Sequence, residues 1–367
     1  MTTVSPARTN NFDSIRLVLA VLVILSHAFP LGRGSNATEP LFALTHGQTT
    51  IGELSVWGFF VISGFLITQS WIRSPSPISY LKRRAGRIYP GFIVLSLLSA
   101  LVIVPIASSA RIYPQLSVAN IANVLRLQEF QTPPVFSKNV THAMNGSLWS
   151  IPYEFWCYLG VLFLGMSRLL HRRYFVIVVF FLVIALHVFM EVTGWNPGGM
   201  IVGKIFGYPR FWPIVLPFFL AGMLFQLFGG RTLIRSSLIP VALIILVASY
   251  FIPHGVAIAM PICGSYLLLA LAYLAALHPL NLGRYGDFSY GVYLYAFPIE
   301  QLVVMAVGGH MSPLVLFALA TPITLLIGSL SWFLVERHFL SKSSQLKHEG
   351  KDLPADLRNQ ARSPLNG

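Results

Sequence analysis

The sequence predicts an all-α, polytopic integral membrane protein with about ten transmembrane helices and with both termini in the cytoplasm. Hydrophobic residues make up 55% of the 367 residues and charged residues only 10%, and the mean hydropathy is +0.70. A water-soluble domain carries about 25% charged residues. The apolar residues also fall into segments long enough to cross a bilayer as helices.

We expect one transmembrane domain over residues 12–340. A cytoplasmic N-terminus at 1–11 precedes it, and a polar cytoplasmic tail at 341–367, which we expect to be disordered, follows it. The expected spans lie at 12–31, 54–72, 90–108, 147–166, 174–191, 211–229, 236–252, 257–277, 288–307 and 313–335.

The distribution of basic residues predicts the orientation. An even number of spans places both termini on one side. If that side is cytoplasmic, all but six of the 25 Lys and Arg residues lie inside, as the positive-inside rule requires. The six outside are Arg33, Arg111, Arg126, Lys138, Lys204 and Arg210. The net charge of +13 therefore reflects topology, and we expect no nucleic-acid partner.

The first expected span carries Asp13, Arg16 and His27. Positions eleven apart on a helix differ by only about 20° in rotation, so Arg16 and His27 share a face about 16 Å apart along the axis. Asp13 lies one turn before Arg16 and is placed to pair with it. Ionisable residues inside a span usually face a cavity or a partner. The alternative is that Asp13 and Arg16 mark the interface and that His27 is a packing residue.

The segment SYLKRRAGRIYP places four cations between Lys82 and Arg87 against the inner membrane face. Such a loop often contacts anionic lipid headgroups. If the segment is helical, however, Arg84 and Arg87 are three residues apart and both guanidinium groups can bind one polyanion. In the second span, Ser63 and Gly64 permit close helix packing and are expected to support the structure.

Two further spans contain carboxylates. Glu154 lies roughly 10 Å below the outer boundary of the fourth span, and His27 roughly 6 Å below that of the first. A His–Glu pair is a common general-base arrangement, and the alternative is that Glu154 binds a local hydroxyl such as Tyr153 or Ser150. Glu300 is a second buried candidate, whereas Glu336 is expected to mark the inner interface.

Taken together, these segments resemble the membrane-bound acyltransferase family 3. The resemblance rests on Asp-x-x-Arg with Arg-x10-His in the first span, and on five further segments in the same order over about residues 10–340. These are GFFVISGFLIT, RRAGRIYP, WSIPYE, SYGVYLYAFP and VERHF. The chain departs from the family at Ala296, where many members have a histidine.

The resemblance implies an enzyme of the bacterial cytoplasmic (inner) membrane. It would transfer an acyl group, commonly acetyl from cytoplasmic acetyl-CoA, to a hydroxyl of an extracytoplasmic glycan such as O-antigen, exopolysaccharide or a lipo-oligosaccharide. It implies functional roles for Arg16, His27, Arg84, Arg87 and Glu154. We expect acyl-CoA as a donor substrate, a glycan or lipid-linked glycan as acceptor, no permanently bound cofactor and no metal.

The expected mechanism places the phosphates of the acyl-CoA at Arg16, Arg84 and Arg87. His27, oriented by Glu154, would then accept the proton of the attacking sugar hydroxyl, or would itself carry the acyl group as a covalent intermediate. An alternative function from another class is a proton-coupled transporter in which His27, Glu154 and Glu300 form a proton relay.

Overall fold

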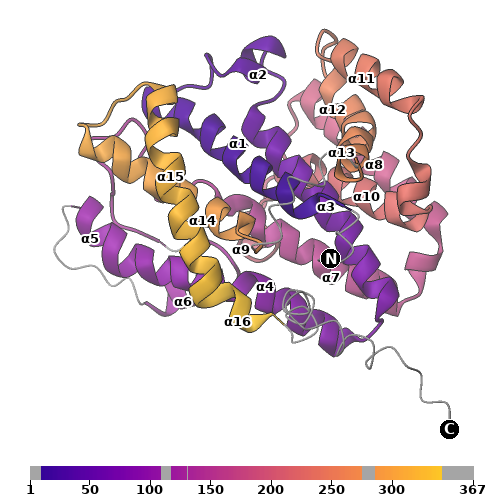
Figure 1. Ribbon diagram of the computed structural model, residues 1–367, viewed down its shortest axis with the longest axis horizontal. Coiled ribbons are helices and arrows are strands. Elements are labelled where there is room, and N and C mark those ends of the chain that lie inside the picture. The colour runs from indigo at the N-terminus through magenta and orange to yellow at the C-terminus, as the bar shows by residue number, and fades with distance from the viewer. Residues whose placement is uncertain (1–9, 109–116, 130, 275–285, 341–367) are drawn as a thin grey trace, which may run out of the picture.

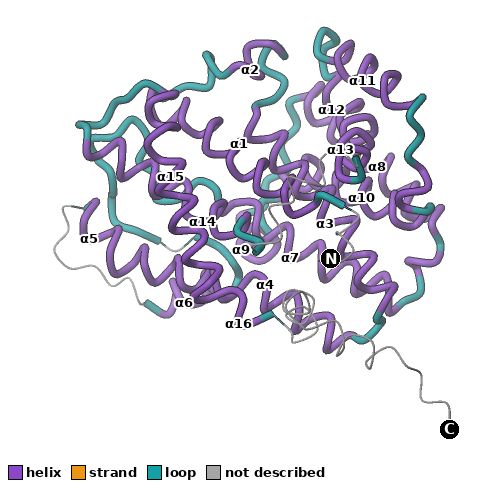
Figure 2. The backbone as a smooth tube through the Cα atoms, in the orientation of Figure 1, coloured by secondary structure: helices purple, strands orange, loops and turns teal. Residues whose placement is uncertain are grey.

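The computed structural model describes residues 10–108, 117–129, 131–274 and 286–340 (Figure 1). Within these ranges the chain forms helices and loops, and its only β contact is an isolated bridge between Ser108 and Val135. Figure 2 accordingly shows helices joined by loops. The prediction of an all-α fold is confirmed, while the expected tail at 341–367 lies outside the described residues.

The helices are α1 (Phe12–Arg33), α2 (Pro40–Leu44), α3 (Ile51–Arg73), α4 (Pro77–Leu98), α5 (Val104–Ala107), α6 (Val118–Leu125), α7 (Ile151–Met166), α8 (Arg173–Thr193), α9 (Met200–Phe206), α10 (Trp212–Leu227), α11 (Leu238–Ser249), α12 (Gly255–Ala259), α13 (Ser265–Ala272), α14 (Ser289–Ala306), α15 (Pro313–Ser331) and α16 (Arg337–Phe339). Single π-helical turns continue α4 into α5, α12 into α13 and α15 into α16.

Helices occur at all ten expected spans, but seven of them within the described residues are long and apolar enough to cross a bilayer. The other three are α7, with 16 residues, α11, with 12 residues, and α14. The first two are shorter than the roughly 20 residues that a span needs. Helix α14 carries tyrosines, Glu300 and Gln301 and is buried along most of its length, so it forms part of the bundle core.

Local sequence explains where the site-bearing helices begin and end. Helix α1 ends at Gly34, which adopts the left-handed conformation (φ 79°) that favours glycine. Helix α3 begins with a capping box between Thr50 and Glu53. Helix α4 begins with Pro77 in its first turn, where proline is favoured. The basic segment 82–87 lies within this helix. The condition for Arg84 and Arg87 to face one ligand is therefore met.

Helix α1 packs against α3, α14 and α15, whereas α7 packs against α3, α4 and α10. In Figure 1, α14 and α15 lie on one side of α1, and α10 to α13 lie on the other. Helix α3 therefore contacts both α1 and α7.

Glycines permit the closest helix contact in the bundle described here. A Cβ atom on Gly64 of α3 would overlap the carbonyl oxygen of Phe219 in α10, and one on Gly222 of α10 would overlap the carbonyl oxygen of Val61. The two backbones are thus in direct contact, as small residues allow in membrane helices. The prediction that Gly64 serves packing is supported by this geometry.

Candidate functional site

Helix α1 carries Arg16 near its beginning and His27 near its end. Arg16 lies against α4 and the segment before α14, while His27 lies against α14. The structure therefore gives α1 a polar contact at each end, about 16 Å apart at 1.5 Å per residue.

At the Arg16 end, four arginines line one pocket of about 100 Å³. They are Arg16 from α1 and Arg83, Arg84 and Arg87 from α4, and we call this site the arginine pocket. Ser63 of α3 and Tyr158 of α7 also line it. The sequence singled out three of these arginines as candidate ligands, and the structure brings all three together. It adds Arg83.

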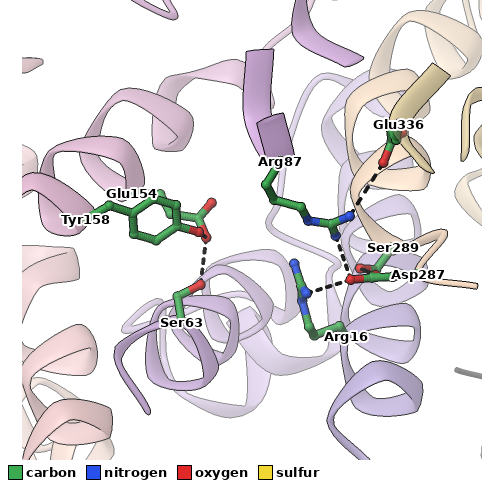
Figure 3. A network of polar contacts seen from close by, with 8 residues as sticks. All are labelled: Arg16, Ser63, Arg87, Glu154, Tyr158, Asp287, Ser289 and Glu336. Carbon is green, nitrogen blue, oxygen red and sulfur yellow. Dashed lines mark hydrogen bonds and ion pairs between the residues drawn. The ribbon is translucent and has the colours of Figure 1, made fainter. Parts of the chain in front are cut away.

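Asp287 is the central carboxylate of this region (Figure 3). Its Oδ2 atom accepts hydrogen bonds from Arg16 Nη1 at 2.8 Å and from Arg87 Nη2 at 2.7 Å, and its Oδ1 atom accepts one from Ser289 Oγ at 2.6 Å. The expected pairing of Arg16 with Asp13 is corrected. The carboxylate that binds Arg16 is Asp287, because the packing of α14 against α1 brings Asp287 to the arginine.

Burial opposes ionisation of Asp287, but the guanidinium groups of Arg16 and Arg87 outweigh it and hold the pKa of Asp287 below its usual value. Asp287 is therefore an anion at neutral pH. Its negative charge offsets part of the positive charge of the four arginines that line the pocket.

Glu336 also belongs to this network and does not mark the interface. It is 1% exposed, and its Oε2 atom lies 3.7 Å from Arg87 Nη1, as Figure 3 shows. Ser331 donates a hydrogen bond of 2.9 Å to its Oε1 atom. The expectation rested on the position of Glu336 just beyond the tenth expected span, whereas the π-helical turn Trp332–Glu336 packs against α4 and buries the side chain beside Arg87.

Arg83 and Arg84 still have hydrogen-bonding capacity within the pocket. Arg84 Nε and Arg83 Nη2 are buried and have no hydrogen-bond partner among the described residues. The Arg84 guanidinium carbon lies 5.9 Å from the ring centres of both Tyr80 and Tyr158, which fixes its plane. Buried donors are normally satisfied, and an anionic ligand with several oxygens would satisfy these.

Glu154 does not pair with His27 in the structure. Its Oε1 atom accepts hydrogen bonds from Ser63 Oγ at 2.6 Å and from Tyr158 Oη at 2.5 Å, and Figure 3 shows these three side chains together. The expected His27–Glu154 contact is thus corrected, because Glu154 lies with Ser63 and Tyr158 at the arginine pocket, whereas His27 lies near the other end of α1. A hydroxyl partner was the alternative considered, but the hydroxyls are Ser63 and Tyr158, not Tyr153 or Ser150. Ser63 consequently has a polar contact as well as a packing position.

The carboxylate beside His27 is Glu300. His27 Nδ1 lies 3.9 Å from Glu300 Oε2, and the two side chains are 22% and 0% exposed. The ring of Phe297 stands edge-on to the His27 ring at a centroid distance of 5.3 Å. His27 Nδ1 and both carboxylate oxygens of Glu300 lack a hydrogen-bond partner among the described residues.

A loop packs on α14 next to this pair. Gln301 Nε2 donates to the carbonyl oxygens of Thr141 and Ala143 at 2.8 and 2.7 Å, and Asn139 Nδ2 donates to Gln301 Oε1 at 2.8 Å. Thr141 Oγ1 donates to the Pro30 carbonyl of α1 at 3.2 Å. The loop thus joins the ends of α1 and α14 close to His27.

Sequence reasoning missed Arg83 and Asp287 as members of the site. Arg83 lies in the basic segment 82–87, four residues before Arg87. On a helix this spacing places the two side chains on the same face, so the sequence could have indicated Arg83. Asp287 lies two residues before Ser289, the first residue of the segment SYGVYLYAFP, but only the fold places it beside Arg87, 200 positions away.

Comparisons with known proteins show the family of this chain. The sequence model described as an acyltransferase domain matches residues 9–333. An O-acetyl transferase of Shigella phage Sf6 is 31% identical over 350 residues, which cover 92% of this chain and 98% of that protein. Nodulation protein 10 of Rhizobium leguminosarum bv. viciae is 38% identical over 90 residues, or 24% of each chain. No solved structure matches the chain significantly.

Proposed function

Because the chain belongs to the acyltransferase domain family and is an acyltransferase, we propose that it moves an acyl group from a cytoplasmic acyl-CoA to a hydroxyl of an extracytoplasmic glycan. The acyl group is acetyl, and the acceptor is a polysaccharide or lipid-linked glycan. The protein acts as a multi-pass enzyme of the bacterial cytoplasmic membrane.

The observation that carries this proposal is the arginine pocket at one end of α1, with His27 at the other end of the same helix. Acyl-CoA has phosphates at one end and a thioester at the other, joined by a long flexible arm. Guanidinium groups suit phosphates because they offer several donors in a fixed plane. The unsatisfied donors of Arg83 and Arg84 would bind the phosphates, and the arm would follow α1 to bring the thioester to His27.

His27 serves as the general base in this proposal. Its imidazole accepts the proton of the glycan hydroxyl as that oxygen attacks the thioester carbon. The C–S bond then breaks, and the imidazolium returns its proton to the CoA thiolate. The products are an O-acyl glycan and free CoA, and His27 is neutral again.

Neither the comparisons nor the described contacts support the transporter alternative. A proton relay needs hydrogen-bonded steps between His27, Glu154 and Glu300. Glu154 is instead bound to Ser63 and Tyr158, which line the arginine pocket at the opposite end of α1 from His27.

The proposal includes an orientation in which the α3–α4 connection and both termini are cytoplasmic. Cysteine accessibility tests it, because the two native cysteines, Cys157 and Cys263, are buried. A cysteine at Ser74 should react with an impermeant maleimide in inverted vesicles and not in intact cells. Labelling of that position from outside intact cells would overturn the placement of the donor site.

The activity is tested with radiolabelled acetyl-CoA and membranes of the native host, whose own glycans serve as acceptors. His27→Ala should lower glycan labelling per folded protein by about 10²- to 10⁴-fold, as expected for loss of a general base. His254→Ala is the matched control, because His254 lies before α12 and pairs with Glu191. Normal turnover by folded His27→Ala protein would refute the mechanism.

A further inference from the structure

We propose that Glu300 is the positioning residue for His27, an inference that rests on the proposed function. Its carboxylate would accept a hydrogen bond from Nδ1–H of the imidazole. This contact would hold the ring so that Nε2 faces the acceptor hydroxyl. Glu300 would act through His27 and would not touch the substrate.

The burial of Glu300 is the first observation behind this proposal. Glu300 is 0% exposed, and neither of its carboxylate oxygens has a hydrogen-bond partner among the described residues. Burying such a group without a partner is costly, so buried carboxylates are normally paired or hydrogen-bonded. The other buried glutamates of this bundle follow that rule. Glu39 accepts bonds from the backbone N–H of Phe42 and of Ile51, and Glu336 accepts one from Ser331.

The second observation is that the nearest unsatisfied donor position belongs to His27. Its Nδ1 atom also lacks a partner and lies 3.9 Å from Glu300 Oε2. A hydrogen bond needs about 2.7–3.2 Å, which a small rotation of the ring supplies. Catalytic hydrogen bonds are often long in a ligand-free enzyme and shorten when the substrate is bound.

The third observation is that α14 presents two neighbouring side chains to the imidazole of His27. Phe297 and Glu300 are three residues apart on α14 and therefore face the same side, with the Phe297 ring edge-on to His27. The next residue, Gln301, is held by Asn139, Thr141 and Ala143, which prevents α14 from turning away. The imidazole of His27 therefore lies next to both the Phe297 ring and the Glu300 carboxylate.

This arrangement accounts for the proton at each step. With Nδ1–H donated to Glu300, Nε2 has a free lone pair and can take the hydroxyl proton while the C–O bond forms. The imidazolium then donates to Glu300 at Nδ1 and releases the Nε2 proton to the departing CoA thiolate. The Glu300 carboxylate stabilises the cation between these two steps and keeps its own protonation state.

The test compares Glu300→Gln, Glu300→Asp and Glu191→Gln in the acetyl-CoA assay, with rates expressed per monodisperse protein. Glu300→Gln should lower kcat by about 10²-fold, the effect of a misplaced catalytic group, and leave both KM values near wild type. Glu300→Asp keeps the charge and should retain more activity than Glu300→Gln. Glu191→Gln, which alters the His187–Glu191 pair on α8, should be fully active.

A double variant separates positioning from support of the fold. In a His27→Ala background, Glu300→Gln should cause no further loss of the residual rate, because residues that act as one unit are not additive. Three results would each overturn the inference. The first is a double variant whose loss of rate equals the product of the two single losses. The others are equal losses for Glu300→Gln and Glu300→Asp, and a normal kcat for Glu300→Gln. Failure of the wild-type protein to transfer acetyl from acetyl-CoA to a glycan would instead refute the proposed function, so the two failures are distinguishable.

Discussion

The Nη2 atom of Arg87 lies 2.7 Å from the Oδ2 atom of Asp287, although the two residues are 200 positions apart in the chain. This ion pair joins α4 to the beginning of α14 at the base of the arginine pocket. Because the pKa of Asp287 is held below its usual value in the folded protein, the pair stabilises the fold at any pH above the unfolded pKa of about 3.9. That stability is lost only as the pH falls through the folded pKa.

Asp287→Asn should destabilise the protein, since it leaves Arg16 and Arg87 without their shared counter-charge. Breaking a buried ion pair by removing one partner costs about 3–5 kcal/mol. Thermal unfolding in detergent should show a lower midpoint at every pH from 5 to 8. Added CoA should raise the unfolding midpoint of the variant by more than it raises the midpoint of the wild type, because its phosphates replace the missing negative charge. A difference that disappears between pH 7 and pH 5 would contradict this account.

Arg84→Lys should raise the KM for acetyl-CoA and leave the KM for the glycan unchanged. Lysine cannot reproduce two guanidinium hydrogen bonds, and one bond to a charged group contributes about 1.5–3 kcal/mol, so an increase of about 10-fold or more is expected. Arg84 is a better test than Arg87, whose guanidinium already binds Asp287. Arg172→Lys, at an exposed position, is the control. Equal changes in both KM values would exclude a donor-specific role.

Glu154→Gln should act on donor binding and not on the chemical step. Glu154 holds Ser63 and Tyr158, and both line the arginine pocket. The amide retains one oxygen acceptor but loses the charge that strengthens both bonds. Steady-state kinetics should show a several-fold higher KM for acetyl-CoA with kcat close to wild type. A fall in kcat comparable to that of His27→Ala would restore Glu154 as the partner of His27.

Gly64→Ala should lower stability by about 1–3 kcal/mol, the usual result of overpacking, because the added methyl group would overlap the backbone of Phe219. The measurement is the thermal midpoint in detergent. Gly160→Ala on α7 is the control, since its Cβ would meet nothing within 4 Å, and alanine favours the helix by about 1 kcal/mol. Equal destabilisation by both substitutions would show that helix contact is not the cause.

Some of this site could be predicted from spacing within one helix. The shared face of Arg16 and His27, and the convergence of Arg84 and Arg87, follow from helical geometry alone, and the fold keeps both. The segments expected to be helical are also helical in the described chain. Local periodicity suffices for these features because the atoms concerned lie within a few turns of each other.

The partners across helices could not be predicted in this way. The sequence suggests comparable depths for Glu154 and His27, yet the fold places Glu154 with Ser63 and Tyr158 at the arginine pocket, near the Arg16 end of α1. Asp287 and Glu336 reach the arginine pocket only because α14 and α15 pack beside α1 and α4. Which helices are neighbours depends on the packing of the whole bundle, including the backbone contact at Gly64 and Gly222. No local pattern in a single sequence specifies these neighbours.

The location of Arg16 and His27 on one uninterrupted stretch of α1 has a consequence for donor choice. Their separation is set by the helical rise, so it acts as a molecular ruler that motions of other helices leave unchanged. A donor whose arm is too short would place its thioester below His27 while its phosphates were bound, and would occupy the protein without reacting. Under the proposed function, substrate length, and not only the chemistry of the acyl group, should therefore be a criterion by which the donor is selected.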